Sequence, residues 1–148
     1  MVQRAALTYL SPRRGSVAVF ELDSPETIVG RAPLAVRDLP EYVDLASNRE
    51  VFQIRGGDTL FVVIASDMAM CRQHFCIHRA VTASGEAVYF LRDLNSRCGT
   101  YLNNTQIKKV EHLKDVTILG VVLGSCSTWR RKTRGIMNNR GEPLNGLL

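Results

Sequence analysis

Short apolar runs separated by turn-forming residues repeat along most of the chain and predict a protein built of β-strands. The run 59–64 is the strongest example, because β-branched and aromatic residues fill it and Gly57-Asp58 and Ser66-Asp67 bound it. Similar runs predict strands at 17–22, 26–29, 74–81, 87–94 and 116–123, with shorter ones at 100–102 and 106–110. No long 3.6-residue periodicity is present. Many short strands at close spacing favour an all-β sandwich or barrel.

The segment between residues 32 and 58 does not follow this pattern. Pro33 and Pro40 interrupt it, the residues around Tyr42 favour a short helical turn, and 51–54 is apolar enough for an extra strand. We interpret 32–58 as an insertion between framework strands. The predicted organisation is an N-terminal segment (1–16), a β-sandwich (17–124) and a basic C-terminal extension (125–148).

Length and composition fit one ordinary globular domain. A chain of 148 residues buries roughly 68–70% of its unfolded surface on folding, so it needs no disulfide, metal or other cofactor to form a core. No apolar run approaches the ~20 residues of a membrane span, and the N-terminus lacks the apolar centre of a signal peptide. Four cysteines without an evident disulfide framework favour the nucleus or the cytosol.

The net charge of +5 is concentrated near the C-terminus. The basic residues there are Arg130, Arg131, Lys132, Arg134 and Arg140, with only Glu142 to oppose them. Such a run is most often a solvated surface. The alternative is a weak nucleic-acid contact through this tail, which would weaken steeply as the salt concentration rises.

A polar loop that ends in glycine lies between the strands expected at 87–94 and 100–102. Gly99 permits backbone angles denied to other residues, and Asn103-Asn104 offers a tight turn. A strand–loop–strand unit of this kind presents a loop on a rigid scaffold, where binding sites commonly lie. An ordinary hairpin connection is the alternative interpretation.

Four short motifs in series resemble the forkhead-associated (FHA) domain. They are Gly30-Arg31, Cys71-Arg72-Gln73-His74, Asp93 through Asn103, and Leu113 through Gly120. The family pattern is Gly-Arg, Ser-x-x-His, Ser-x-Asn-Gly-Thr-x-x-Asn and Leu-x-x-Gly-Asp-x-Ile-x-x-Gly. The resemblance covers about residues 17–124. It implies an FHA-like β-sandwich of two twisted, mainly antiparallel sheets, whose loops at one end bind phosphothreonine peptides in nuclear signalling, particularly the DNA-damage response.

The resemblance also implies which residues bind. A phosphate carries a charge of about −1.5 to −2 and three acceptor oxygens, which a guanidinium meets with a rigid fork of donors. Arg31 matches the family's phosphate-contacting arginine, and Arg72 and Arg97 lie in the two binding loops. The expected phosphopeptide-binding residues are Arg31, Cys71, Arg72, Ser96, Arg97 and Cys98. Structural support of the loops is expected from Gly30, His74, Gly99, Thr100 and Asn103.

Two positions depart from the family pattern. Cys71 stands where the family has the phosphate-binding serine, and a thiol is a weaker donor than a hydroxyl. Cys98 stands where the family has an asparagine that holds the main chain of the ligand. Our main hypothesis is a phosphothreonine reader that uses the added arginines. The second is a degenerate FHA domain that no longer binds phosphothreonine and serves homodimerisation or phosphate-independent protein binding.

The cysteines and histidines at 71–78 raise two other chemical possibilities, a zinc site and a catalytic cysteine. His74, Cys76 and His78 would share one face of a strand, but a spacing of about 6–7 Å per two residues keeps three such side chains from converging on one zinc ion. No protease signature surrounds Cys71 or Cys98. We therefore predict no metal site and no catalytic residues, and an interaction module in place of an enzyme.

Overall fold

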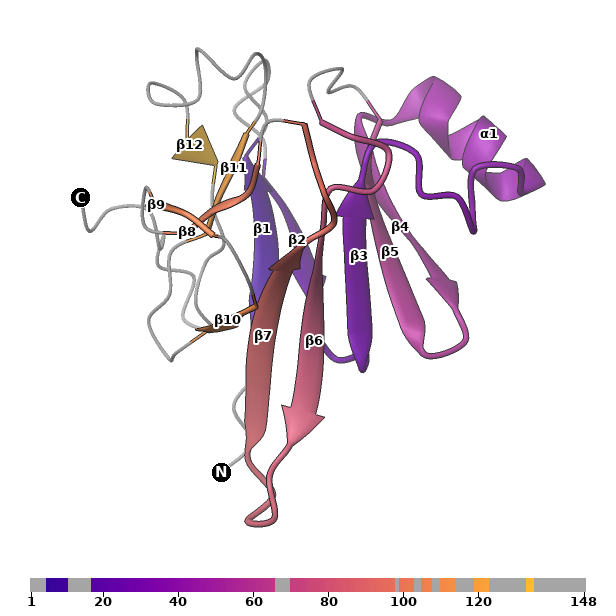
Figure 1. Ribbon diagram of the computed structural model, residues 1–148. Helices are drawn as coiled ribbons and strands as arrows, with labels where there is room; N and C mark the ends of the chain where they lie inside the picture. The colour runs from indigo at the N-terminus through magenta and orange to yellow at the C-terminus, as the bar shows by residue number, and fades with distance from the viewer. Residues whose placement is uncertain are drawn as a thin grey trace.

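The computed structural model describes residues 5–10, 17–65, 70–97, 99–102, 105–107, 110–113, 119–122 and 133–134. Strands dominate it, and the predicted all-β sandwich is confirmed (Figure 1). The elements are β1 (Ala6–Leu10), β2 (Val17–Glu21), β3 (Glu26–Gly30), α1 (Pro40–Asn48), β4 (Val51–Gly56), β5 (Thr59–Ile64), β6 (Phe75–Val81), β7 (Ala87–Asp93), β8 (Tyr101–Leu102), β9 (Thr105–Gln106), β10 (Glu111–Leu113), β11 (Leu119–Val122) and β12 (Thr133–Arg134).

The largest sheet has six strands in the order β10-β7-β6-β3-β5-β4. All neighbours in it are antiparallel except β3 and β5, which are parallel. Parallel neighbours need a long crossover between them. The segment 31–58 supplies that crossover, because α1 and β4 carry the chain back before β5 begins. Smaller sheets are formed by β1-β2 and by β12-β11-β8-β9.

Strand β5 explains why its sequence is apolar without alternation. Leu60, Val62 and Ile64 enter one hydrophobic cluster, whereas Phe61 and Val63 enter another on the opposite face of the sheet. The strand is therefore covered on both faces, and such strands have near-continuous hydrophobic sequences. The first cluster also holds residues of the β1–β2 hairpin.

Helix α1 covers the second cluster. Its Tyr42, Leu45 and Ala46 pack there, and the Tyr42 ring meets the ring of Phe52 edge-on with 5.8 Å between centroids. A proline in the first turn suits the start of a helix, where its missing N–H costs nothing. Among the described residues, no helix is both long and apolar enough to cross a bilayer.

Strand β1 lies outside the residues predicted to form the sandwich. It pairs antiparallel with β2, and its Leu7 and Tyr9 are buried in the first cluster. Thr8 between them is buried as well. Clean apolar–polar alternation, the signal of a half-buried strand, is therefore missing from β1.

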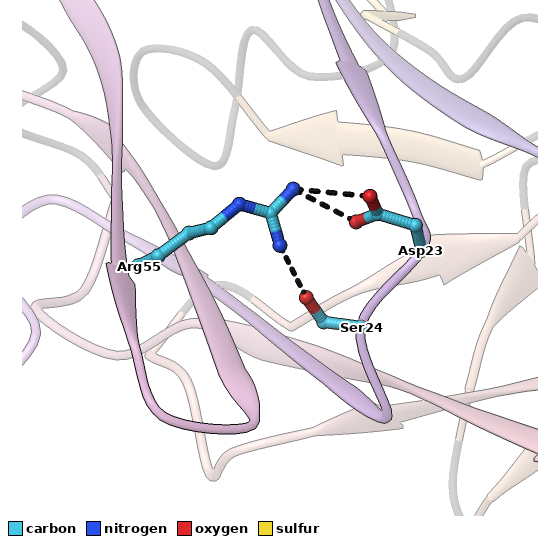
Figure 2. A network of polar contacts seen from close by, with 3 residues as sticks. All are labelled: Asp23, Ser24 and Arg55. Carbon is cyan, nitrogen blue, oxygen red and sulfur yellow. Dashed lines mark hydrogen bonds and ion pairs between the residues drawn. The ribbon is translucent and has the colours of Figure 1, made fainter.

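A polar network joins the turn before β3 to the end of β4 (Figure 2). Both terminal nitrogens of Arg55 donate hydrogen bonds, one to Ser24 Oγ at 2.9 Å and the other to the two carboxylate oxygens of Asp23 at 2.9 and 3.1 Å. The hydrogen bonds from Arg55 to the Asp23 carboxylate hold the pKa of Asp23 below its ordinary value. The contact fixes the edge strand β4 against the rest of the sheet.

Replacing Asp23 with asparagine is expected to lower the free energy of unfolding at pH 7 by only about 0.2–1 kcal/mol, because the pair is half-exposed and screened by solvent. A carboxylate with a lowered pKa stabilises the fold above its unfolded-state pKa and loses that contribution as the pH falls through the folded-state value. Urea unfolding should therefore separate D23N from the wild type at pH 7 and bring the two together in acid. A difference that persists at low pH would contradict the role of the charge.

Candidate functional site

Three loops meet at one end of the six-stranded sheet. One follows β3, one precedes β6 and one follows β7, and Figure 1 shows these strand ends side by side. The first two loops are joined through their backbones, since the N–H groups of Arg31 and Ala32 donate to the carbonyls of Cys71 and Arg72 at 3.0 and 3.1 Å. The antiparallel pairing of β3 with β6 and of β6 with β7 brings the loops together.

Gly30 makes the approach of the first two loops possible. A Cβ added at this position would lie 2.0 Å from the carbonyl oxygen of Arg72 and 2.9 Å from Cα of Gln73. Both neighbours are backbone atoms, so no side-chain rotation could relieve the contact. The loop before β6 can sit against the end of β3 only because residue 30 has no side chain.

His74 links the loop before β6 to the loop after β7. The ring is fully buried, its Nδ1 lies 3.2 Å from the backbone N of Cys71, and its Nε2 lies 2.8 Å from the carbonyl oxygen of Gly99. An amide only donates and a carbonyl only accepts, so the proton of the neutral ring is on Nε2. His74 thus braces both loops through backbone groups.

Arg31 is held in place at both its side chain and its backbone. Its Nε donates to the carbonyl of Met70 at 3.2 Å, and its own carbonyl accepts a hydrogen bond from the Tyr42 hydroxyl at 3.3 Å. The side chain is half-buried. With Nε engaged, the two Nη groups are the part of the guanidinium fork that a ligand would meet.

The loop after β7 is built around Asp93. Its carboxylate accepts hydrogen bonds from the backbone N–H of Ser96 at 3.0 Å, from the Ser96 hydroxyl, and from the Thr100 hydroxyl at 2.6 Å. Asn95 and Gly99 adopt positive φ angles of 59° and 81°, which let the loop turn back. No role was predicted for Asp93, although aspartate is a common turn residue because its side chain accepts hydrogen bonds from the backbone that follows it.

Cys71 joins the same two loops through its sulfur. Its Sγ accepts a hydrogen bond from the backbone N–H of Arg97 at 3.1 Å. The contact between Cys71 and His74 runs through the Cys71 amide and leaves the thiol out. The geometry of a thiol nucleophile beside its histidine base is therefore not formed here.

Arg72 and Arg97 are exposed, and Arg31 is half-buried. The backbone hydrogen bond from Arg31 to Cys71 places it close to Arg72 in the neighbouring loop. Within the described part of the chain, none of the three forms an ion pair with a carboxylate. Cys98 and Asn103 lie outside the described residues, as do 114–118 of the closing motif and most of the basic extension, residues 133–134 apart.

Cys76 and His78 approach each other more closely than strand spacing suggested. The Cys76 Sγ lies 3.2 Å from Nε2 of His78, whose Nδ1 is 3.9 Å from the Glu26 carboxylate. Burial raises the pKa of the Cys76 thiol, and Arg92 offsets only part of that shift. The thiol therefore stays protonated and weakly nucleophilic. The described residues contain no group of three or more side chains placed to hold a metal ion.

The matched region of the chain extends from the end of β4 to β11. Residues 55–121 match the family model of the FHA domain. This region is similar to the FHA domain family. The resemblance expected from the four motifs is thereby confirmed. FHA domains are interaction modules known for phosphothreonine-dependent protein binding. No curated protein sequence matches the chain.

Several solved structures share the fold, two of them FHA domains. The FHA domain of the CT664 protein from Chlamydia trachomatis is 24% identical over 90% of this chain and 94% of that one, with a TM-score of 0.52. The MEK1 FHA domain is 16% identical over 91% and 89% of the two chains, with a TM-score of 0.56. EmbR from Mycobacterium tuberculosis, solved with a low-affinity phosphopeptide, is 12% identical over 92% of this chain and 24% of that one, with a TM-score of 0.51.

Proposed function

We propose that this FHA domain binds phosphothreonine-containing peptides at the three linked loops. The observation that carries the proposal is the gathering of three arginines around Cys71. The Arg31 amide donates to the Cys71 carbonyl, Arg72 follows Cys71 in the chain, and the Arg97 amide donates to the Cys71 sulfur. Guanidinium groups without carboxylate partners in the described residues suit a dianionic phosphate.

Each arginine has its own part in this proposal. Arg31 is the primary phosphate contact, because its hydrogen bond to the Met70 carbonyl orients the fork before a ligand arrives. Arg72 and Arg97 add positive charge from the rims of the two loops. Cys71 contributes by positioning the Arg97 amide, in place of the hydroxyl donor expected of a serine.

Ser96 and Cys98 complete the proposed binding loop in different ways. The Ser96 hydroxyl donates to Asp93 and so shapes the loop. Cys98 directly precedes Gly99, whose carbonyl is bound by His74. We place Cys98 beside the main chain of the ligand on the strength of its position in the motif.

Arg31→Ala is expected to weaken binding of a phosphothreonine peptide by at least about tenfold, because a hydrogen bond to a charged group contributes roughly 1.5–3 kcal/mol. The measurement is fluorescence anisotropy with a peptide selected from a degenerate phosphothreonine library, run beside its unphosphorylated form. Arg79→Ala, on β6 away from the loops, removes the same charge and serves as the matched control.

Three results are informative. Binding that needs both the phosphate and Arg31, with Arg79→Ala unchanged, supports the proposal. Phosphate-dependent binding that Arg31→Ala leaves intact would remove Arg31 from its assigned role. A folded protein with no phosphate-dependent signal would overturn phosphothreonine recognition altogether.

The second candidate is a degenerate FHA domain that acts by homodimerisation or phosphate-independent binding. The engagement of the Arg97 amide by the Cys71 sulfur favours it, because that donor is then occupied before any ligand arrives. Sedimentation equilibrium at several concentrations measures the self-association that this hypothesis requires.

We also propose a cellular role and a second type of ligand for this protein. A role in nuclear signalling, including the DNA-damage response, would follow from a partner phosphorylated there. Nucleic-acid contact through residues 125–148 would add a salt-sensitive component to binding. The partner selected from the phosphothreonine library is the starting point for the first, and the salt dependence of nucleic-acid binding tests the second.

A further inference from the structure

Exposed apolar side chains are concentrated in one part of the insertion. The described residues contain six large hydrophobic side chains with substantial exposure, and three of them, Leu34, Leu39 and Val43, fall within ten residues of sequence. Their exposed fractions are 56%, 37% and 59%. We call these three residues the apolar patch. Gathered exposed apolar side chains mark interaction sites more often than single ones do.

The insertion that carries this patch is attached directly to the candidate site. The backbone N–H of Leu34 donates to Oε1 of Gln73 at 3.2 Å, and the Tyr42 hydroxyl donates to the carbonyl of Arg31 at 3.3 Å. Leu39 and Val43 lie one helical turn apart, since the Val43 amide donates to the Leu39 carbonyl. Figure 1 shows α1 at the same end of the sheet as the loops around Arg31.

The charge around the patch has the opposite sign to the charge of the loops. Between residues 33 and 48 the sequence has Asp38, Glu41 and Asp44 against the single basic residue Arg37, in a chain whose net charge is +5. Arg37 lies 4.0 Å from Asp38, which leaves Glu41 and Asp44 to the solvent. The insertion therefore combines exposed apolar surface with negative charge, directly beside a cluster of arginines.

We propose that residues 34–44 form a second contact surface for the polypeptide that carries the phosphothreonine. The surface takes an apolar side chain flanked by lysine or arginine, while the loops take the phosphate. Leu34 comes three residues after Arg31 in this chain. An extended peptide advances about 3.3 Å per residue, so a peptide of ordinary length reaches both. This inference rests on the proposed function and adds the sequence preference of its ligand.

The test compares two double variants in a phosphothreonine library with one randomised position at a time. L39S/V43S removes apolar side chains from the patch. V19S/V81S is the matched control, because Val19 and Val81 are exposed by 59% and 57% on strands β2 and β6, outside the insertion. We expect L39S/V43S to bind the selected peptide about three- to tenfold more weakly and to lose the preference for an apolar residue. E41K/D44K should lose the preference for basic residues.

The outcomes separate this inference from the function on which it rests. Phosphate-dependent binding with unchanged preferences in L39S/V43S and E41K/D44K would overturn the second contact surface and leave phosphothreonine recognition intact. Equal loss in V19S/V81S would also overturn it, because the effect would not belong to the patch. Absence of phosphate-dependent binding in the wild type would overturn both. Circular dichroism of each variant shows that the fold is retained.

Discussion

Gly30→Ala is expected to destabilise the protein by about 3 kcal/mol, since forcing extra atoms into a packed region typically costs 1–3 kcal/mol and sometimes more. The added Cβ would lie 2.0 Å from the Arg72 carbonyl oxygen and 2.7 Å from its carbon. The same carbonyl oxygen also accepts the hydrogen bond from the Ala32 amide. Relief of the clash therefore requires the loop before β6 to move away from β3. Urea unfolding monitored by circular dichroism measures the loss.

Gly56→Ala is the matched control for this substitution. A Cβ at position 56 would meet only the ring edge of Phe61, a side chain, at 3.3 Å, so a small adjustment accommodates it. We expect a change below about 1 kcal/mol there. If Gly30→Ala were as mild as Gly56→Ala, the close approach of the two loops would not exist in solution. Hydrogen exchange at the Arg31 and Ala32 amides should rise in Gly30→Ala and stay constant in Gly56→Ala.

Strands β5, β6 and β7 of the main sheet could be predicted because each carries its own local signal, whereas β10 (Glu111–Leu113) lies just beyond the strand predicted at 106–110. β5 occupies the predicted residues 59–64, and β6 and β7 begin or end within one residue of the predicted limits. These strands are bounded by glycine, serine and aspartate, and their apolar positions meet the core clusters. Burial and turn formation depend on a few neighbouring residues, so a short stretch of sequence is enough to predict such strands.

The insertion illustrates the limit of that local signal. A short helical turn and an extra strand were expected, and the structure has a nine-residue helix and a six-residue edge strand. The position of α1 against Phe52 and Val63 depends on the parallel pairing of β3 with β5. That pairing joins residues about thirty positions apart, so no short window of sequence contains it.

In the candidate site, too, the sequence identified residues, whereas the fold determined the contacts between them. The motifs named Arg31, Cys71 and Arg97, but the bond between the Cys71 sulfur and the Arg97 amide spans 26 positions. A thiol at position 71 suggested a lost hydrogen bond, and the structure uses its sulfur as an acceptor between loops. The identity of a side chain limits its chemistry, whereas the fold decides which partner it meets.

His74→Ala is expected to lower the free energy of unfolding by about 3–5 kcal/mol, because it opens a cavity in the core and removes the ring that bonds the partly buried Cys71 amide and the buried Gly99 carbonyl. The ring is fully buried and bonds the Cys71 amide and the Gly99 carbonyl. A loss of this size is a large part of the 5–15 kcal/mol that typically stabilises a domain. Phosphopeptide binding should weaken too, since Arg97 lies in the loop that His74 braces. Urea unfolding and fluorescence anisotropy measure the two effects.

His74→Asn separates the two hydrogen bonds. The asparagine oxygen can replace Nδ1 as the acceptor for the Cys71 amide, but the shorter side chain does not reach the Gly99 carbonyl. Its stability should therefore fall between those of the wild type and His74→Ala, with the loop after β7 loosened and the loop before β6 retained. His78→Ala, in the adjoining strand β6 and with a partly exposed ring, is the control and should cost far less. Equal stability of His74→Ala and His78→Ala would show that His74 does not hold the binding loops together.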